Sequence, residues 1–220
     1  MHHSTGQVCA DYLQEVCAAL QVEWPENRTI NIVCHGHSVP AGYFATPHVD
    51  SVNAYPHQLF LRVKARYPHA VTNVIVTAIG GEASPAGAAR FARDVLSHRP
   101  DVLLIDYALN DRGKGLAAAQ TAWRHMIESA LAQGSKVILL TPTADTAAQL
   151  TDPQDPLCQH AEQIRALARE YHVGLVDSLQ CFTEFVANGG VLADLMSQSN
   201  HPNRAGHALV ATEIFRWFAR

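Results

Sequence analysis

The stretch Thr29-Ile30-Asn31-Ile32-Val33-Cys34, followed at once by His35-Gly36-His37-Ser38, has the composition of a buried strand that ends in a loop. Four further apolar runs share this character, at residues 73–78, 102–107, 136–141 and 173–177. Most of them are near-continuous runs of Val, Ile and Leu, which is typical of strands buried on both faces of a sheet. The sequence therefore predicts five strands.

Amphipathic helical patterns separate these strands. They begin near Val8, Leu59 and Leu116, after the pairs Ser84-Pro85 and Asp155-Pro156, and after Asn203. Ser84 is expected to cap the helix that follows it, Asp155-Pro156 to open the next but one, and Gly134 to end the helix before it. Because strand and helix alternate, the expected fold is α/β: a three-layer α/β/α architecture with a flavodoxin-like five-stranded parallel sheet. No linker divides the chain, so residues 1–220 are expected to form a single domain.

Composition excludes several classes of function. The net charge of −4 and the lack of any Lys/Arg block argue against a nucleic-acid partner. No apolar run approaches the ~20 residues that span a bilayer, so no membrane partner is expected. The start Met1-His2-His3-Ser4 leads into an amphipathic pattern and not into an export signal. The five cysteines lack framework spacing, which favours reduced thiols and a cytoplasmic location.

Polar residues and glycines follow the strands where ligands bind in such sheets, at the carboxyl ends. Ser38 follows the first strand, Gly80-Gly81 the second and Asn110 the third, and His201 precedes the last helix. A serine is a useful nucleophile when a base takes its proton, and glycine N–H and asparagine amide groups can bind an oxyanion. Each feature also has a purely structural interpretation, as a turn residue or a surface histidine.

In their order and placement, these four short blocks resemble the SGNH-hydrolase family, also called the GDSL esterases and lipases. The resemblance runs from about Thr29 to the C-terminus. It implies that Ser38 is the nucleophile and His201 the base. It also implies an oxyanion hole made by the Ser38 N–H, the Gly81 N–H and the Asn110 side chain. Gly81 is chosen over Gly80 because Gly-Glu-Ala-Ser best matches the Gly-Asp-Thr-Ser run of the family.

The sequence departs from the family pattern at three places. His37 replaces the aspartate before the serine, Ala108 replaces the glycine of Gly-x-Asn-Asp, and Gln198 replaces the aspartate three residues before the histidine. A neutral acceptor is therefore expected to orient His201, either the Gln198 side-chain oxygen or a backbone carbonyl of the loop. His37 is expected to be structural and not the base, because adjacent side chains diverge on an extended chain.

The resulting hypothesis is a serine esterase that needs no cofactor. Its expected partner is a small-molecule ester with a short acyl group, such as an acetylated carbohydrate. Two alternatives remain open at this point. The scaffold is either a non-catalytic module that binds a small molecule or glycan, or a hydrolase with a metal held by His35, His37 and His201. Tyr43, Phe44 and Met196 either shape the pocket or simply pack.

Overall fold

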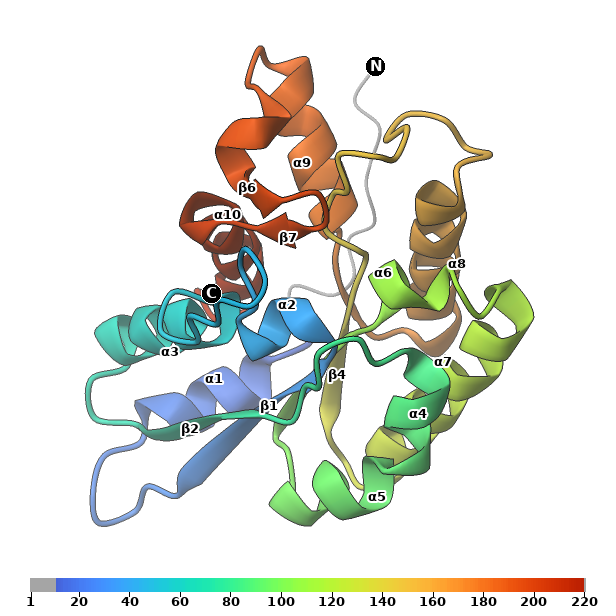
Figure 1. Ribbon diagram of the computed structural model, residues 1–220. Coiled ribbons are helices and arrows are strands. Elements are labelled where there is room, and N and C mark those ends of the chain that lie inside the picture. Colours follow the sequence, from blue (N-terminus) through green and yellow to red (C-terminus); the bar gives the residue numbers. More distant parts are fainter. Residues whose placement is uncertain (1–10, 220) are drawn as a thin grey trace, which may run out of the picture.

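A computed structural model describes residues 11–219 of the protein (Figure 1). Five parallel strands form one sheet in the order β2-β1-β3-β4-β5, which confirms the flavodoxin-like prediction. The strands are β1 (Thr29–Gly36), β2 (Val71–Val76), β3 (Val102–Asp106), β4 (Lys136–Leu140) and β5 (Gly174–Val176). All five lie where the apolar runs predicted them, with ends shifted by no more than two residues.

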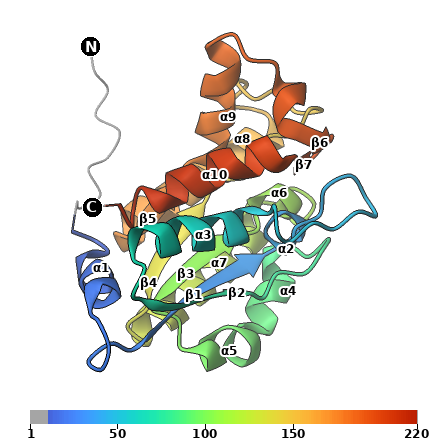
Figure 2. The same cartoon turned by 90° about the vertical axis from the view of Figure 1, so that its left-hand side faces the viewer.

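Helices cover both faces of the sheet, which makes the three layers (Figure 2). One face carries α1 (Gln14–Gln21), α3 (Tyr55–Arg66), α9 (Ser178–Ala187) and α10 (Arg204–Phe215). The other face carries α4 (Ser84–Ala89), α5 (Phe91–Asp94), α7 (Leu116–Ala132) and α8 (Pro156–Tyr171). Within residues 11–219, no helix combines the length and hydropathy that a membrane span requires.

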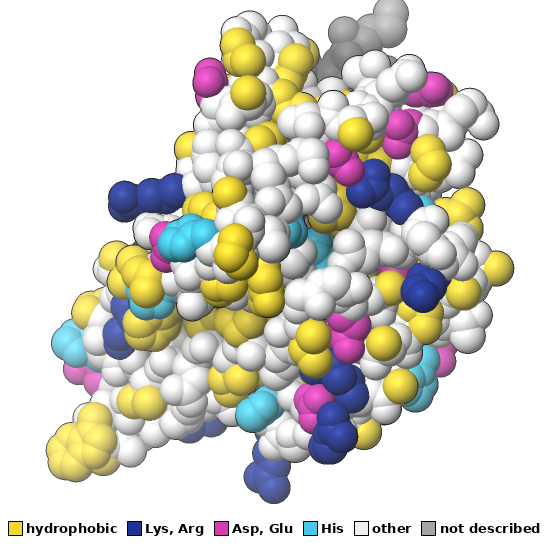
Figure 3. All heavy atoms as spheres, viewed as in Figure 1, with side chains coloured by type: hydrophobic (Ala, Val, Ile, Leu, Met, Phe, Trp, Pro, Cys, Tyr) yellow, Lys and Arg dark blue, Asp and Glu magenta, His cyan; other side chains and the backbone are white. Residues whose placement is uncertain are grey.

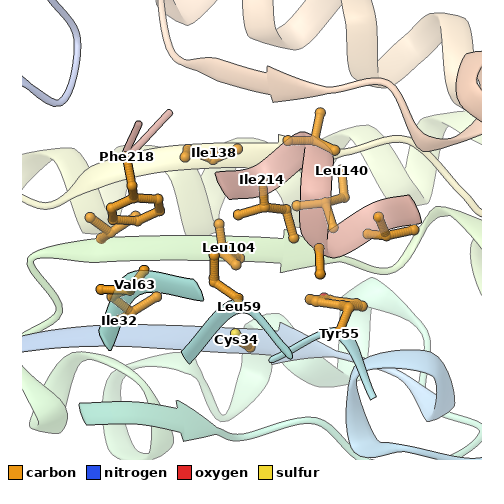
Figure 4. Packing of buried hydrophobic residues seen from close by; sticks show 14 of the residues in the cluster. Ile32, Cys34, Tyr55, Leu59, Val63, Leu104, Ile138, Leu140, Ile214 and Phe218 are labelled. Carbon is orange, nitrogen blue, oxygen red and sulfur yellow. The ribbon is translucent and has the colours of Figure 1, made fainter. Parts of the chain in front are cut away.

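The alternation of side chains along the strands builds two cores. Ile32, Cys34 and Leu104 face α3 and α10 (Figure 4), whereas Val33 and Leu103 face α7. Fully buried strands of this kind need apolar residues on both faces, which explains the continuous Val, Ile and Leu runs of the sequence.

Most predicted helix boundaries are present. The Asp155 carboxylate caps α8 by accepting from the Leu157 N–H, and the Asn203 side chain caps α10. Gly134 follows α7 with a φ of 80°, in the left-handed conformation that commonly ends a helix. Val8, in the first predicted helix, lies outside the described residues.

The prediction for the segment after Ser84-Pro85 was wrong in two respects. Ser84 is the first residue of α4 and not its cap, and its backbone N–H donates instead to the Asp111 carboxylate at 2.7 Å. The expected single helix is broken at Arg90 into α4, α5 and the 3₁₀ turn η1 (Leu96–His98). The Arg90 guanidinium bonds to the Glu82 carboxylate and the Thr77 carbonyl, which ties this residue to the preceding loop.

Several short elements were not predicted. They are α2 (Ser38–Ala41), α6 (Ala108–Asp111), η2 (Leu192–Leu195) and the antiparallel hairpin of β6 (Met196–Gln198) and β7 (His201–Pro202). Three of the four candidate positions lie on them: Ser38 begins α2, Asn110 is in α6 and His201 begins β7. Because Ser38, Asn110 and His201 lie on regular elements and not in irregular loops, the backbone fixes the direction of their side chains.

Candidate active site

Strand pairing places Ser38 at the carboxyl edge of the sheet, after β1, which lies between β2 and β3. Gly36, the last residue of β1, pairs with Asp106, the last residue of β3. A Cβ at Gly36 would run into the Asp106 carbonyl, so glycine is required where the two strands meet. The chain then turns at His37, whose N–H donates to the Asp106 carbonyl at 3.2 Å, and Ser38 opens α2.

His201 reaches Ser38 from the β6–β7 hairpin, which lies above α2 (Figure 1). The His201 Nε2 atom is 2.8 Å from the Ser38 Oγ atom. On the other side of the ring, Nδ1 lies 2.8 Å from the carbonyl oxygen of Phe44. A carbonyl only accepts, so a hydrogen bond here requires the proton on Nδ1, and this is the tautomer that leaves the Nε2 lone pair facing the Ser38 hydroxyl. This arrangement is suited to removing the serine proton.

Gln198 also contacts His201, but through its nitrogen. The Gln198 Oε1 atom accepts from the Thr46 N–H at 2.8 Å, and Nε2 lies 2.8 Å from the His201 Nδ1 atom and donates to Asn200. Rotating the amide would set an N–H against the Thr46 N–H. Of the two neutral acceptors expected from the sequence, the backbone carbonyl faces Nδ1 and the Gln198 oxygen does not. With the proton on Nδ1, the Gln198 Nε2 group makes no hydrogen bond to the ring, because both groups are donors.

The surroundings of His201 favour its neutral form. Burial lowers the pKa of His201 below the ordinary 6.5, and the nearby His37 lowers it further, whereas the bond to the Phe44 carbonyl raises it. Burial is the largest of these effects. The imidazole is thus available as a base at and below neutral pH. In Figure 3 histidine atoms reach the surface at a recess near the middle of the face, where the hairpin meets α2.

The second and third blocks supply hydrogen-bond donors at the same edge. Gly81 has a φ of 77°, which favours glycine, and a Cβ there would meet nothing within 4 Å, so its backbone borders open space. A Cβ at Gly80 would instead collide with the Tyr43 ring. Within residues 11–219, the backbone N–H groups of Ser38 and Gly81 donate to no protein acceptor. Both are therefore free to bind an anionic oxygen.

The Asn110 amide is held by the loop that carries Gly81. Its Nδ2 atom donates to the Glu82 carbonyl at 2.9 Å, which uses one of its two N–H bonds. The Glu82 carboxylate is fixed by Arg90 and by the Tyr107 hydroxyl at 2.7 Å. Asn110 thus has a fixed orientation and one N–H left for a ligand.

The two histidines beside Gly36 enter separate networks. His35 contacts the Thr77 hydroxyl at 2.9 Å and the Tyr107 hydroxyl at 3.1 Å, on the α4 side of the sheet. The His37 Nε2 atom faces the Asp106 carboxylate at 3.3 Å. Among the residues that the structure describes, no three His, Cys, Asp or Glu side chains form a group able to hold a metal ion. The geometry therefore does not favour the metal alternative.

Two contributors were missed in the sequence. The Phe44 carbonyl has no side-chain signature, so its role could not be read from residue type. Asp106 offered a signal, because it is a carboxylate at the end of an otherwise apolar strand.

Of the three pocket candidates, Tyr43 lies with its ring 6.1 Å from the His201 ring, Phe44 is buried against His207, and Met196 packs on the core.

Comparison with known proteins decides the family. The model of the GDSL-like lipase/acylhydrolase family matches residues 34–209, which include all the positions described above. The chain belongs to this family. A search of the curated proteins finds no match.

Solved structures with the same fold include two carbohydrate esterases. A two-domain esterase active on acetylated mannans is 23% identical, with a TM-score of 0.78 over 96% of this chain. This acylhydrolase spans about half of that protein, 53% of its length. An acetylxylan esterase from Geobacillus stearothermophilus is 22% identical, with a TM-score of 0.74 over 87% of this chain and 94% of its own. At these identities the likeness establishes the fold.

Proposed function

We propose that this acylhydrolase cleaves a short-acyl ester of a small substrate through an acyl-enzyme on Ser38, with His201 as the base. The observation that carries the proposal is the contact of 2.8 Å between the Ser38 Oγ and His201 Nε2 atoms, with the Phe44 carbonyl behind Nδ1. The Ser38 N–H, the Gly81 N–H and the Asn110 amide would stabilise the oxyanion.

The steps follow from this geometry. Ser38 Oγ adds to the ester carbonyl carbon as its proton passes to His201 Nε2, and the oxyanion forms against the three donors. His201 then gives the proton to the leaving alcohol as the ester C–O bond breaks. Water enters, loses a proton to His201 and releases the acid, and Ser38 recovers its proton.

The proposal names acetylated carbohydrates as the substrate class. The two structural relatives described above act on acetylated mannans and acetylxylan, which supports this choice. The test is acetate release from acetylated xylo- and manno-oligosaccharides, compared with p-nitrophenyl esters of increasing acyl length. Selective turnover of acetyl esters, blocked by a serine-directed phosphonate and insensitive to chelator, is expected. A folded protein that is inactive on every ester would contradict the proposal.

We also propose that the protein works in the cytoplasm, as one domain over residues 1–220. Support for the location comes from the four cysteines that the structure describes, all of which are free thiols: Cys17, Cys34, Cys158 and Cys181. Support for one domain comes from the sheet, whose two cores draw on elements from α1 to α10.

Asn110→Ala is expected to lower kcat by roughly 10²–10³, the usual effect of losing one oxyanion donor. Its N–H would be used only as negative charge develops, so KM should change little. Steady-state kinetics on p-nitrophenyl acetate measures both constants. Asn188→Ala, in the exposed residue that follows α9, is a matched control. A change confined to KM would show that Asn110 binds substrate and does not stabilise the oxyanion.

Gln198→Asp is expected to move the acidic limb of kcat/KM to higher pH. His201 acts as a base only when neutral, and burial lowers its pKa, so wild-type activity should persist below pH 6.5. A carboxylate three residues before His201 would stabilise the imidazolium and raise that pKa. The pH–rate profiles of the two proteins measure the shift. An unmoved profile would show that residue 198 does not interact with the charged ring.

Asp194→Asn is expected to leave activity unchanged. The Asp194 side chain is exposed and makes no hydrogen bond among the described residues, whereas its backbone carbonyl accepts from the Asn203 amide. The Asp111 carboxylate is equally committed elsewhere, to the Ser84 N–H and the Trp123 indole. A loss of orders of magnitude in kcat on Asp194→Asn would mean that this acid swings in as a third catalytic member.

A further inference from the structure

The Ser38 hydroxyl has a second histidine neighbour. The Nδ1 atom of His37 lies 3.3 Å from the Ser38 Oγ atom. This proximity arises because Ser38 begins the helical turn α2, so that the two adjacent side chains do not diverge as they would on an extended chain. The His37 ring is completely buried.

The contacts of His37 define its protonation state. Its Nδ1 atom accepts from the Val39 N–H at 3.3 Å, so Nδ1 carries a lone pair. Its Nε2 atom lies 3.3 Å from Asp106 Oδ1, close enough for an ion pair but outside hydrogen-bond geometry, and neither atom has a hydrogen-bond partner among the described residues. The other Asp106 oxygen accepts from the Tyr55 hydroxyl. A buried carboxylate therefore stands behind His37, whereas a neutral carbonyl stands behind His201.

Two imidazole lone pairs consequently point at one hydroxyl proton. From this juxtaposition we infer that His37, backed by Asp106, is a second base for Ser38, able to support acylation but not the later proton transfers. The inference rests on the proposed function, because it assigns a further catalytic residue to the same nucleophile. The shorter contact, 2.8 Å against 3.3 Å, makes His201 the base in the intact protein.

The step balances without any further reactant. As Ser38 Oγ bonds to the acyl carbon, its proton moves to His37 Nδ1 and displaces the long bond from Val39. The positive charge of the imidazolium is stabilised by the Asp106 carboxylate, 3.3 Å from Nε2. The ester C–O bond breaks, and the leaving oxygen departs with the electron pair. His37 has no exposed surface, so it cannot reach the groups that bind outside Ser38. It can neither donate a proton to an alcohol leaving group nor accept one from the attacking water.

Because His37 cannot protonate a leaving group, esters with different leaving groups can show whether it is the base. A p-nitrophenolate departs without protonation, whereas an alkoxide needs an acid. In a His201→Ala protein, p-nitrophenyl acetate should therefore acylate Ser38 with a burst of about one p-nitrophenolate per protein, followed by slow turnover. Ethyl acetate should give no burst. Intact-protein mass spectrometry should show one added acetyl group, and its absence from His201→Ala/Ser38→Ala would locate the group on Ser38.

The decisive comparison is His201→Ala against His201→Ala/His37→Asn. The asparagine oxygen can still accept from the Val39 N–H, so the second protein keeps the turn and loses the base. The burst rate is expected to fall by roughly 10²-fold, the contribution of a general base. His201→Ala/Asp106→Asn should also be slower than His201→Ala. Circular dichroism and thermal unfolding confirm that each protein is folded.

The outcomes separate the two proposals. If wild-type and Ser38→Ala proteins have equal activity, the proposed function fails. If the wild type depends on Ser38 but both His201 variants acylate at the same rate, solvent is the base and the inference about His37 is overturned. A burst with ethyl acetate equal to that with p-nitrophenyl acetate would also overturn it, because His37 would then be serving the leaving group.

Discussion

Ser38→Ala is expected to abolish ester turnover while the protein stays folded. Removal of the hydroxyl removes the atom that would form the acyl-enzyme, and in serine hydrolases this lowers kcat by roughly 10⁶. The fold should tolerate the change, because the Ser38 side chain bonds only to the two histidine rings and the turn is held by backbone bonds. Acetate release and the thermal unfolding midpoint measure the two expectations.

Ser178→Ala is the matched control for this experiment. Ser178 is also a buried serine at the start of a helix, and its hydroxyl has no partner among the described residues. Its variant should retain activity. A Ser38→Ala protein with near-normal kcat would end the serine mechanism, and so would labelling by a serine-directed phosphonate that persists in that variant.

The strands and their order were predictable because burial on both faces leaves a strong signal. Ile32, Val33 and Leu104 each serve a core, so the composition of their strands reveals both location and layer. The candidate residues were predictable for a related reason. In a parallel sheet the carboxyl ends share one edge, so Ser38 and Asn110 had to lie near each other once the strand order was known.

The partners of the two histidines were not predictable, because they depend on local geometry. The Phe44 carbonyl reaches His201 only because the chain after α2 folds back toward the β6–β7 hairpin, and every residue has a carbonyl. From the sequence, His37 was expected to be structural and not the base, on the argument that adjacent side chains diverge on an extended chain. The helical turn at Ser38 removes that argument, and the expectation itself remains a prediction.

His201→Ala is expected to lower kcat/KM on acetylated oligosaccharides by roughly 10⁴ or more, far beyond the effect of His37→Ala. Of the two histidines that contact Ser38, His201 keeps some exposed surface and His37 has none, so only His201 can pass a proton to an alcohol and take one from water. Steady-state acetate release measures the two variants. His48→Ala, an exposed histidine of the same loop as Phe44, is the control and should be fully active.

Added imidazole tests whether the His201→Ala protein loses activity because it lacks the imidazole ring as a base. Removal of the His201 side chain leaves the Phe44 carbonyl and the Ser38 hydroxyl facing a space of the same shape, so a free imidazole can bind between them in the productive tautomer. Part of the lost turnover should return in His201→Ala and none in Ser38→Ala. If His37→Ala were the more damaging variant, and imidazole restored that one instead, then the buried histidine would be the working base. The Phe44 carbonyl would in that case have no part in orienting it.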